Sequence, residues 1–131
     1  MLRGWFIAGA LLGGLGVAAG AFGAHGLKAH FEANGQAANW ETAVRYCLFH
    51  AVALLAVAVA AGLPECTACR GRLGAAGFCF ASGTAIFSGL LAILALTGLR
   101  ILGAVVPVGG ALLIAGWALV LAAGLQAAPP R

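Results

Sequence analysis

Charged side chains are scarce in this 131-residue chain. Only 8% of the residues are charged, seven Lys or Arg against three Asp or Glu, whereas 63% are hydrophobic. A water-soluble domain has about a quarter of its residues charged, because those residues cover its surface. This chain lacks the charge to cover a globule in water, so we expect it to be solvated by lipid.

The sequence also lacks the patterns of common chemistries. It contains no P-loop, no haem signature and no nucleophile–base–acid arrangement, and its three acids offer little material for hydrolysis. The basic residues stand at the ends of apolar runs and form no stripe with interleaved aromatics. We therefore expect no enzymatic activity, no cofactor and no nucleic-acid partner.

Four apolar runs dominate what is present, at approximately residues 5–24, 42–62, 73–96 and 106–125. At a helical rise of about 1.5 Å per residue, about 20 residues span the hydrocarbon core of a bilayer. The first run also fits a cleavable signal peptide, but its length and the three later runs favour a span. The pattern predicts an all-α membrane protein, with residues 1–131 forming a single integral membrane domain built as a four-helix transmembrane bundle.

A short interfacial helix is expected between the first two spans. Leu27 and Phe31 stand four residues apart, with Lys28 and Glu32 on a neighbouring face. This spacing is typical of an amphipathic helix that lies at the headgroup level. Gly35, after an asparagine, is a plausible stop for it.

Glycines recur at helix-packing spacing. In the first run they form small-xxx-small pairs, which let a second helix backbone approach closely in lipid. We assign seven glycines to helix packing: Gly9, Gly13, Gly16, Gly20, Gly89, Gly109 and Gly110.

His50 is the titratable side chain, thiols apart, that lies deepest in an apolar run. Tyr46 stands one turn before it, and Arg45 and Glu41 lie towards the interface. An ionisable residue inside a membrane helix is by default a functional-site hypothesis. The candidate ligand or packing site comprises His25, Glu41, Arg45, Tyr46, His50 and Ser88.

Several roles remain open for this site. His25 enters from the same membrane side, and an imidazole pair would relay protons, hold a metal or contact a lipid headgroup. Alternatively, His50 forms a hydrogen bond to a neighbouring helix, with Ser88 as the candidate partner, and locks the packing. Glu41 and Arg45, four residues apart, are expected to form an ion pair at the helix start.

Cys66 and Cys69 form a CxxC pair in the second loop. Such a pair supplies only two of the four ligands of a zinc site, and no second pair or histidine stands nearby in that loop. No thioredoxin-like pattern surrounds it. The two thiols are therefore weak metal candidates, and we expect no bound metal.

Four blocks of residues carry a family resemblance over nearly the whole chain. They are GAFGAHGL at residues 20–27, WETA at 40–43 with Arg45-Tyr46 and His50-Ala51, FSG at 87–89 with LTG at 96–98, and LG at 102–103 with PVGG at 107–110 and GW at 116–117. In this order they resemble domain-of-unknown-function family 423, the YgdD-like small membrane proteins related to eukaryotic transmembrane protein 256. Cys47 departs from the pattern, which usually has Gln there. The resemblance implies a four-helix membrane protein and no established activity.

Two classes of function follow from these observations. The first is an accessory or structural protein that packs within a larger membrane assembly or with copies of itself; the second is a minimal transporter or channel protomer, or a lipid- or small-ligand-binding protein, with its site around His50. A smooth helix face left after the four helices pack would favour a protein partner, whereas a polar cavity at His50 would favour a ligand.

The distribution of basic residues gives a weak orientation signal. With four spans both termini lie on one side of the membrane, and that side carries Arg3, Arg70, Arg72 and Arg131. The other side carries Lys28, Arg45 and Arg100. Arg45 reaches the interface from inside a span and counts less, so we expect an inner (plasma) membrane protein with both termini in the cytoplasm.

Overall fold

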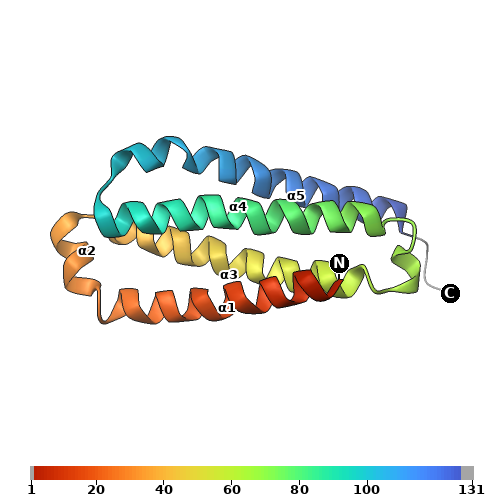
Figure 1. The fold of residues 1–131 in the computed structure, drawn as a ribbon, viewed down its shortest axis with the longest axis horizontal. Coiled ribbons are helices and arrows are strands. Elements are labelled where there is room, and N and C mark those ends of the chain that lie inside the picture. The colour runs from red at the N-terminus through yellow and green to blue at the C-terminus, as the bar shows by residue number, and fades with distance from the viewer. Residues whose placement is uncertain (1, 128–131) are drawn as a thin grey trace.

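The chain folds as an all-helical bundle in a computed structural model that describes residues 2–127. Four long apolar helices run along it: α1 (Leu2–Ala24), α3 (Ala37–Ala60), α4 (Arg70–Thr97) and α5 (Val106–Gln126). The short helix α2 (Lys28–Asn34) joins α1 to α3 at one end (Figure 1). The predicted four-helix membrane bundle, with a short helix between the first two spans, is confirmed.

The turns that separate the helices follow from local chemistry. Gly35 and Gly98 adopt the left-handed conformation, at φ 68° and 73°, and end α2 and α4. Side chains with a Cβ avoid this region, which is why glycine stands at both helix ends. Pro107 lies in the first turn of α5, where its missing N–H costs no helical hydrogen bond.

The helix bounds differ most from the predicted ones at the start of α3. This helix begins at Ala37 rather than near residue 42, because the chain after Gly35 turns directly back into the bundle. The segments before α4 and α5 form short 3-10 turns, η1 (Pro64–Cys66) and η2 (Arg100–Ala104).

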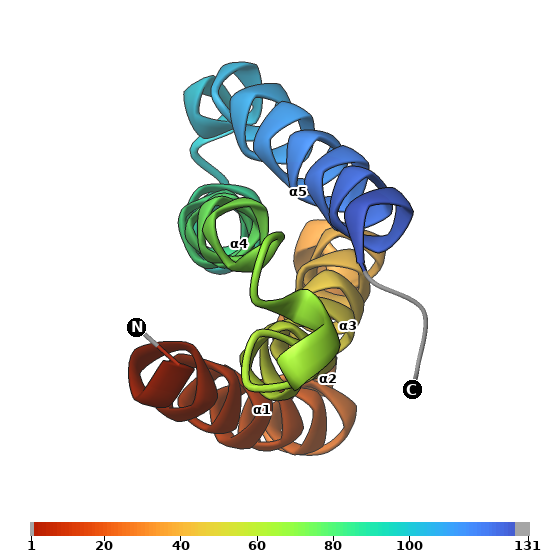
Figure 2. The same ribbon diagram turned by 90° about the vertical axis from the view of Figure 1, so that its right-hand side faces the viewer.

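The helices form a zigzag row rather than a closed square. α1 packs on α3, α3 on α4 and α4 on α5, so that α1 and α5 lie at opposite ends of the row (Figure 2). Few contacts join α1 to α4. The two end helices, α1 and α5, are less buried than α3 and α4, and α1 is the least buried of the four spans.

The α4–α5 interface brings two backbones together at glycine. A Cβ atom added to Gly109 would lie 2.5 Å from the backbone nitrogen of Phe87 and 2.9 Å from the carbonyl oxygen of Gly83. Further along, a Cβ on Gly116 would lie 2.6 Å from the Phe80 ring. Neither position has room for a larger residue, because backbone and buried ring atoms stand in the way.

The α1–α3 seam requires glycine at some positions and not at others. A Cβ on Gly9 would lie 2.8 Å from the carbonyl oxygen of Ala51, and one on Gly16 2.7 Å from Leu48 Cδ2. At Gly13 and Gly20 the nearest atoms would be at ordinary contact distances of 3.8 and 3.4 Å.

Two of the assigned helix-packing glycines lie at positions where an added Cβ would meet no close contact. Gly110 has ordinary contact with the Phe87 ring, and nothing lies within 4 Å of a Cβ placed on Gly89. Gly89 therefore packs against no other helix among the described residues. The assignment also missed four glycines that are in tight contact with another helix: Gly23, Gly77, Gly83 and Gly116.

Candidate functional site

His50 lies in the middle of the bundle with both ring nitrogens engaged. Its side chain is 5% exposed. Nδ1 lies 2.8 Å from the carbonyl oxygen of Tyr46, and Nε2 lies 3.2 Å from the indole Nε1 of Trp117 on α5. A carbonyl only accepts and an indole N–H only donates, so Nδ1 carries the proton and Nε2 accepts. This pattern defines a neutral imidazole.

Aromatic rings enclose His50. The ring centroids of Tyr46, Phe80 and Trp117 lie 5.9, 5.4 and 6.1 Å from that of the imidazole. A metal ion or a proton would bind the lone pair of His50 Nε2, and this lone pair already accepts the hydrogen bond from Trp117. This arrangement ties α3 to α5.

The partners expected for His50 lie elsewhere. The predicted hydrogen bond to Ser88 is absent, because the Ser88 hydroxyl has no partner among the described residues. His25 lies exposed in the turn after α1. His50 lies 13 residues after the first residue of α3 (50 minus 37), about 20 Å along the helix axis. His25 lies at the end of the bundle where α3 begins, so the two imidazoles do not form the predicted pair.

The expected Glu41–Arg45 ion pair is also absent. Among residues 2–127 the one ion pair joins Lys28 Nζ to Glu32 Oε1 at 3.9 Å, within α2. Arg45 forms no hydrogen bond or ion pair with a described residue, and Glu41 has no cation within 4.0 Å. Helical spacing alone therefore does not bring these two side chains together.

A groove of about 310 Å³ runs between α1 and α4, with α3 as its floor. We call it the α1–α4 groove. Small and apolar side chains dominate its lining, which comprises Leu12, Leu15, Gly16, Ala19, Trp40, Ala43, Val44, Cys47, Thr84, Ala85, Ser88, Gly89 and Ala92. The α1–α4 groove is one surface of mainly small residues that stays open once the four helices have packed.

Two buried hydroxyls in the α1–α4 groove have no hydrogen-bond partner. Thr84 is 1% exposed and Ser88 is 7% exposed, and both lie on α4. By contrast, Ser82 and Thr97 of the same helix each donate to the carbonyl four residues earlier, at 2.7 Å. Hydroxyls in membrane helices ordinarily find such a partner, so the unpaired pair marks the groove as unusual.

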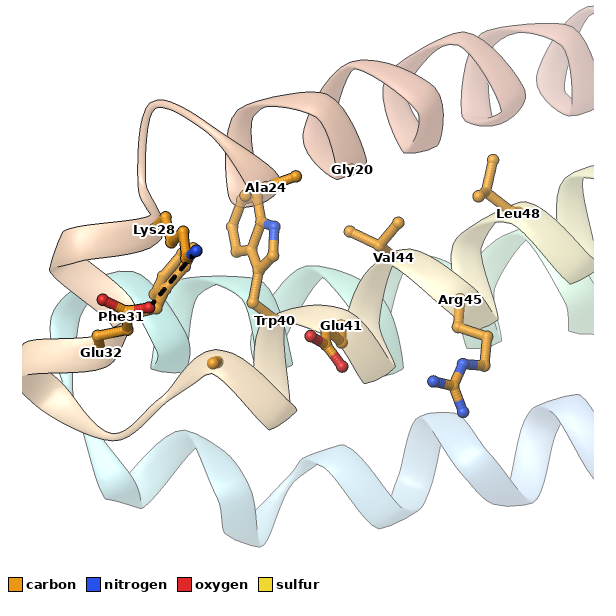
Figure 3. A pocket seen from close by; sticks show the side chains of 12 residues that line it. Gly20, Ala24, Lys28, Phe31, Glu32, Trp40, Glu41, Val44, Arg45 and Leu48 are labelled. Carbon is orange, nitrogen blue, oxygen red and sulfur yellow. Dashed lines mark ion pairs between the residues drawn. The ribbon is translucent and has the colours of Figure 1, made fainter.

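A second hollow of about 530 Å³ lies where α1, α2 and α3 meet. We call it the interfacial pocket. Its charged residues are Lys28, Glu32, Glu41 and Arg45, and its remaining lining is Gly20, Gly23, Ala24, Phe31, Ala37, Trp40, Val44 and Leu48. Figure 3 shows Val44 and Leu48 directed towards α1, while Glu41 and Arg45 project from another side of α3. The pocket thus combines an apolar wall with a charged rim.

The CxxC pair lies at the opposite end of the bundle. Cys69 is fully buried and its Sγ donates to the carbonyl oxygen of Cys66 at 3.3 Å. The side-chain hydrogen bond with Cys69, followed by burial and by the charges of Cys69 and Glu65, raises the pKa of the Cys66 thiol. A protonated thiol is a poor nucleophile and a poor metal ligand. Within residues 2–127 no three His, Cys, Asp or Glu side chains gather as a metal site.

Comparison with known proteins places this architecture in one family. The family profile described as "Protein of unknown function (DUF423)" matches residues 19–110. A UPF0382 membrane protein of Staphylococcus haemolyticus is 40% identical over 117 residues, which cover 89% of this chain and 91% of the relative.

Two further relatives agree with this match. A UPF0382 membrane protein of Staphylococcus saprophyticus is 40% identical over 113 residues, covering 86% of this chain and 89% of the relative. A UPF0382 membrane protein of Bacillus subtilis is 36% identical over 122 residues, covering 93% and 96%. No solved structure matches the chain. The chain belongs to the DUF423 family, the UPF0382 membrane proteins.

Proposed function

We propose that this protein is a non-catalytic interaction protein of the bacterial plasma membrane, which binds a transmembrane helix of another membrane protein in the α1–α4 groove. The observation that carries the proposal is the open groove between α1 and α4, whose lining consists mainly of small residues. The relatives are bacterial membrane proteins, which supports the plasma membrane as the location.

The physical reason is the absence of water in the hydrocarbon core. Helices in that environment associate through close packing rather than through a hydrophobic driving force, because lipid tails are as apolar as their side chains. The small side chains of Ala85, Gly89 and Ala92 let the backbone of that helix come close. Close packing is a main force that joins helices in lipid, and the groove provides a surface for it.

Another protein fits the α1–α4 groove better than a second copy of this chain. The exposed faces of α1 and α5 carry large hydrocarbon side chains such as Leu11, Ile114 and Leu121, which keep their backbones away from a neighbouring helix. A partner helix with small residues on its contact face approaches the groove more closely.

The orientation with both termini in the cytoplasm is part of the proposal. Arg3, Arg70 and Arg72 lie at the bundle end where α1 begins and α5 ends, while Lys28 and Arg100 lie at the other, with Arg45 inside the span. The expected contribution of Arg131 lies outside the described residues. Reporter fusions at each terminus and in the α2 segment test this orientation.

A photo-crosslinking amino acid at position 89 tests the docking. We expect a specific membrane protein to be captured in cells, and native mass spectrometry of the mild-detergent extract to show both chains in one particle. Ala85→Leu fills the groove and abolishes capture, whereas Ala75→Leu, the same change on an exposed position of α4 outside the groove, leaves capture intact. A particle with this chain alone, or capture that survives Ala85→Leu, contradicts the proposal.

A further inference from the structure

One face of α3 is covered by no other helix in the part of the chain that the structure describes. Its exposed positions follow helical spacing and are Glu41, Arg45, Phe49, Val52, Ala56 and Val59. We call this surface the outer α3 face. We propose that two copies of this chain pair through it, with Glu41 of each copy bound to Arg45 of the other copy.

The outer α3 face lies between the two end helices of the bundle. α1 packs on a different side of α3, where Leu48 lies against Gly16. Figure 3 shows Glu41 and Arg45 projecting from α3 away from that side. The side of α3 that faces away from α4 is open between α1 and α5 (Figure 2). A helix of another molecule therefore reaches this face without displacing any helix of the bundle.

Two charges on the outer α3 face lie inside a candidate membrane span, Ala37–Ala60. Glu41 and Arg45 follow the first residue of α3 by four and eight residues (41 and 45 minus 37), about 6 and 12 Å along the helix axis. Neither side chain has an oppositely charged group within 4.0 Å among residues 2–127. Charges within a membrane span are costly unless they are paired. A partner that carries both signs removes both costs.

The symmetry of a pair of identical chains supplies such a partner. Copies that insert with the same orientation pair about a two-fold axis along the membrane normal, so that their α3 helices run parallel and each contact occurs twice. Salt bridges between parallel helices join residues about one turn apart in depth. Glu41 and Arg45 differ by four residues, and a long arginine side chain extends towards the interface, which is the level of Glu41.

Below the charges the outer α3 face is apolar. Phe49, Val52 and Val59 are 62, 65 and 59% exposed. Ala56 is a small residue between them, and such residues allow two helix backbones to approach closely in lipid. A different protein would have to present one acid and one base at matching depths. A second copy of this chain presents them by symmetry, which is why we assign the face to self-association.

Charge reversal in two separately tagged copies tests the pairing. Wild-type copies, co-expressed and extracted in mild detergent, should co-purify. Arg45→Glu leaves two acids on the face and Glu41→Arg leaves two bases, so each variant should co-purify with itself at least fivefold less. Co-expression of the Arg45→Glu chain with the Glu41→Arg chain should restore co-purification, because each face then meets the opposite charge. An ion pair within one chain cannot produce this rescue.

Controls separate this face from the rest of the surface. Arg100→Glu reverses an exposed cation at the same end of the bundle but outside α3, and should co-purify like the wild type. A photo-crosslinking amino acid at position 52 should yield a covalent dimer of this chain, whereas one at position 78, where Phe78 is exposed on α4, should not. Circular dichroism establishes that each variant is folded.

Three results would each overturn the pairing: wild-type self-association by both charge variants, no rescue in the mixture, or a wild-type chain that is monomeric in nanodiscs. The outer α3 face is apart from the α1–α4 groove. Ala85→Leu should therefore leave self-association unchanged while it abolishes capture of the other protein, so that either proposal can fail without the other.

Discussion

Two neighbouring surfaces of α4 carry small residues but meet different surroundings. On one side Gly83 meets Gly109 of α5 so closely that a single Cβ on Gly109 would clash with backbone atoms. On the other side Gly89 faces the α1–α4 groove, where nothing lies within 4 Å of an added Cβ. Small residues therefore mark a surface prepared for contact, and only the assembled bundle distinguishes a contact within the chain from one reserved for another molecule.

The largest effect on stability is expected for Gly109→Ala, at the close contact between α4 and α5. The new methyl group overlaps with the backbone of Phe87, so the two helices must separate. We expect a loss of about 3 kcal/mol of stability, as for severe overpacking. Thermal or denaturant unfolding in detergent measures it. Gly110→Ala is the matched control, since its Cβ would lie 3.6 Å from the Phe87 ring and should change stability little.

A smaller effect is expected at the His50–Trp117 hydrogen bond, which ties α3 to α5. Trp117→Phe leaves Nε2 of His50 buried without a donor, and should cost about 1–2 kcal/mol. Trp5→Phe removes the same ring atoms from a packed position but an indole N–H that is buried and unpartnered, so it should cost less than Trp117→Phe. If both substitutions cost the same in unfolding experiments, the hydrogen bond contributes nothing specific.

Thr84→Val separates stability from docking. The substitution removes an unsatisfied hydroxyl and keeps the shape, so the isolated protein should be as stable as before or up to about 1 kcal/mol more stable. Capture of the partner should persist in the same variant and in combination with Ser88→Ala, because both hydroxyl oxygens are buried beneath the surface of the groove. Ser82→Ala, which removes a hydroxyl already bonded to its own helix, should not affect capture either. Loss of capture by the double variant would mean that the docked helix reaches these hydroxyls.

The smallest effect concerns Gly89→Ala. Its methyl group enters open space in the isolated chain, and alanine favours a helix over glycine by at most about 1 kcal/mol. Unfolding in detergent should therefore show equal or slightly higher stability. A clear loss would mean that the α1–α4 groove is narrower than described and would weaken the contrast with Gly109.

The sequence was informative about the spans because length and hydrophobicity act locally. The apolar runs, the stop at Gly35 and the position of Pro107 at the start of α5 all follow from single stretches of chain. The close approach at Gly83 and Gly116 could not be derived in the same way, because it depends on which ring or backbone faces each glycine across two helices.

The candidate site shows the same limit. His50 could be selected as a buried ionisable residue, but its acceptor role for Trp117 depends on a residue 67 positions away. Glu41 and Arg45 had the spacing of an ion pair, yet their side chains do not come within 4.0 Å of each other. Ser88 and Thr84 became informative only when their lack of a partner was visible. Spacing predicts proximity along one helix and says little about what lies opposite.

The zigzag order of the helices has a consequence for how the protein is made. Every major interface, α1 with α3, α3 with α4 and α4 with α5, joins spans that follow one another along the chain. Contacts between sequence neighbours close with little loss of chain entropy and form quickly. Each span can thus pair with its predecessor as soon as it leaves the ribosome and enters the membrane, and no early helix has to wait for the last one. Synthesis itself gives this bundle its order of assembly.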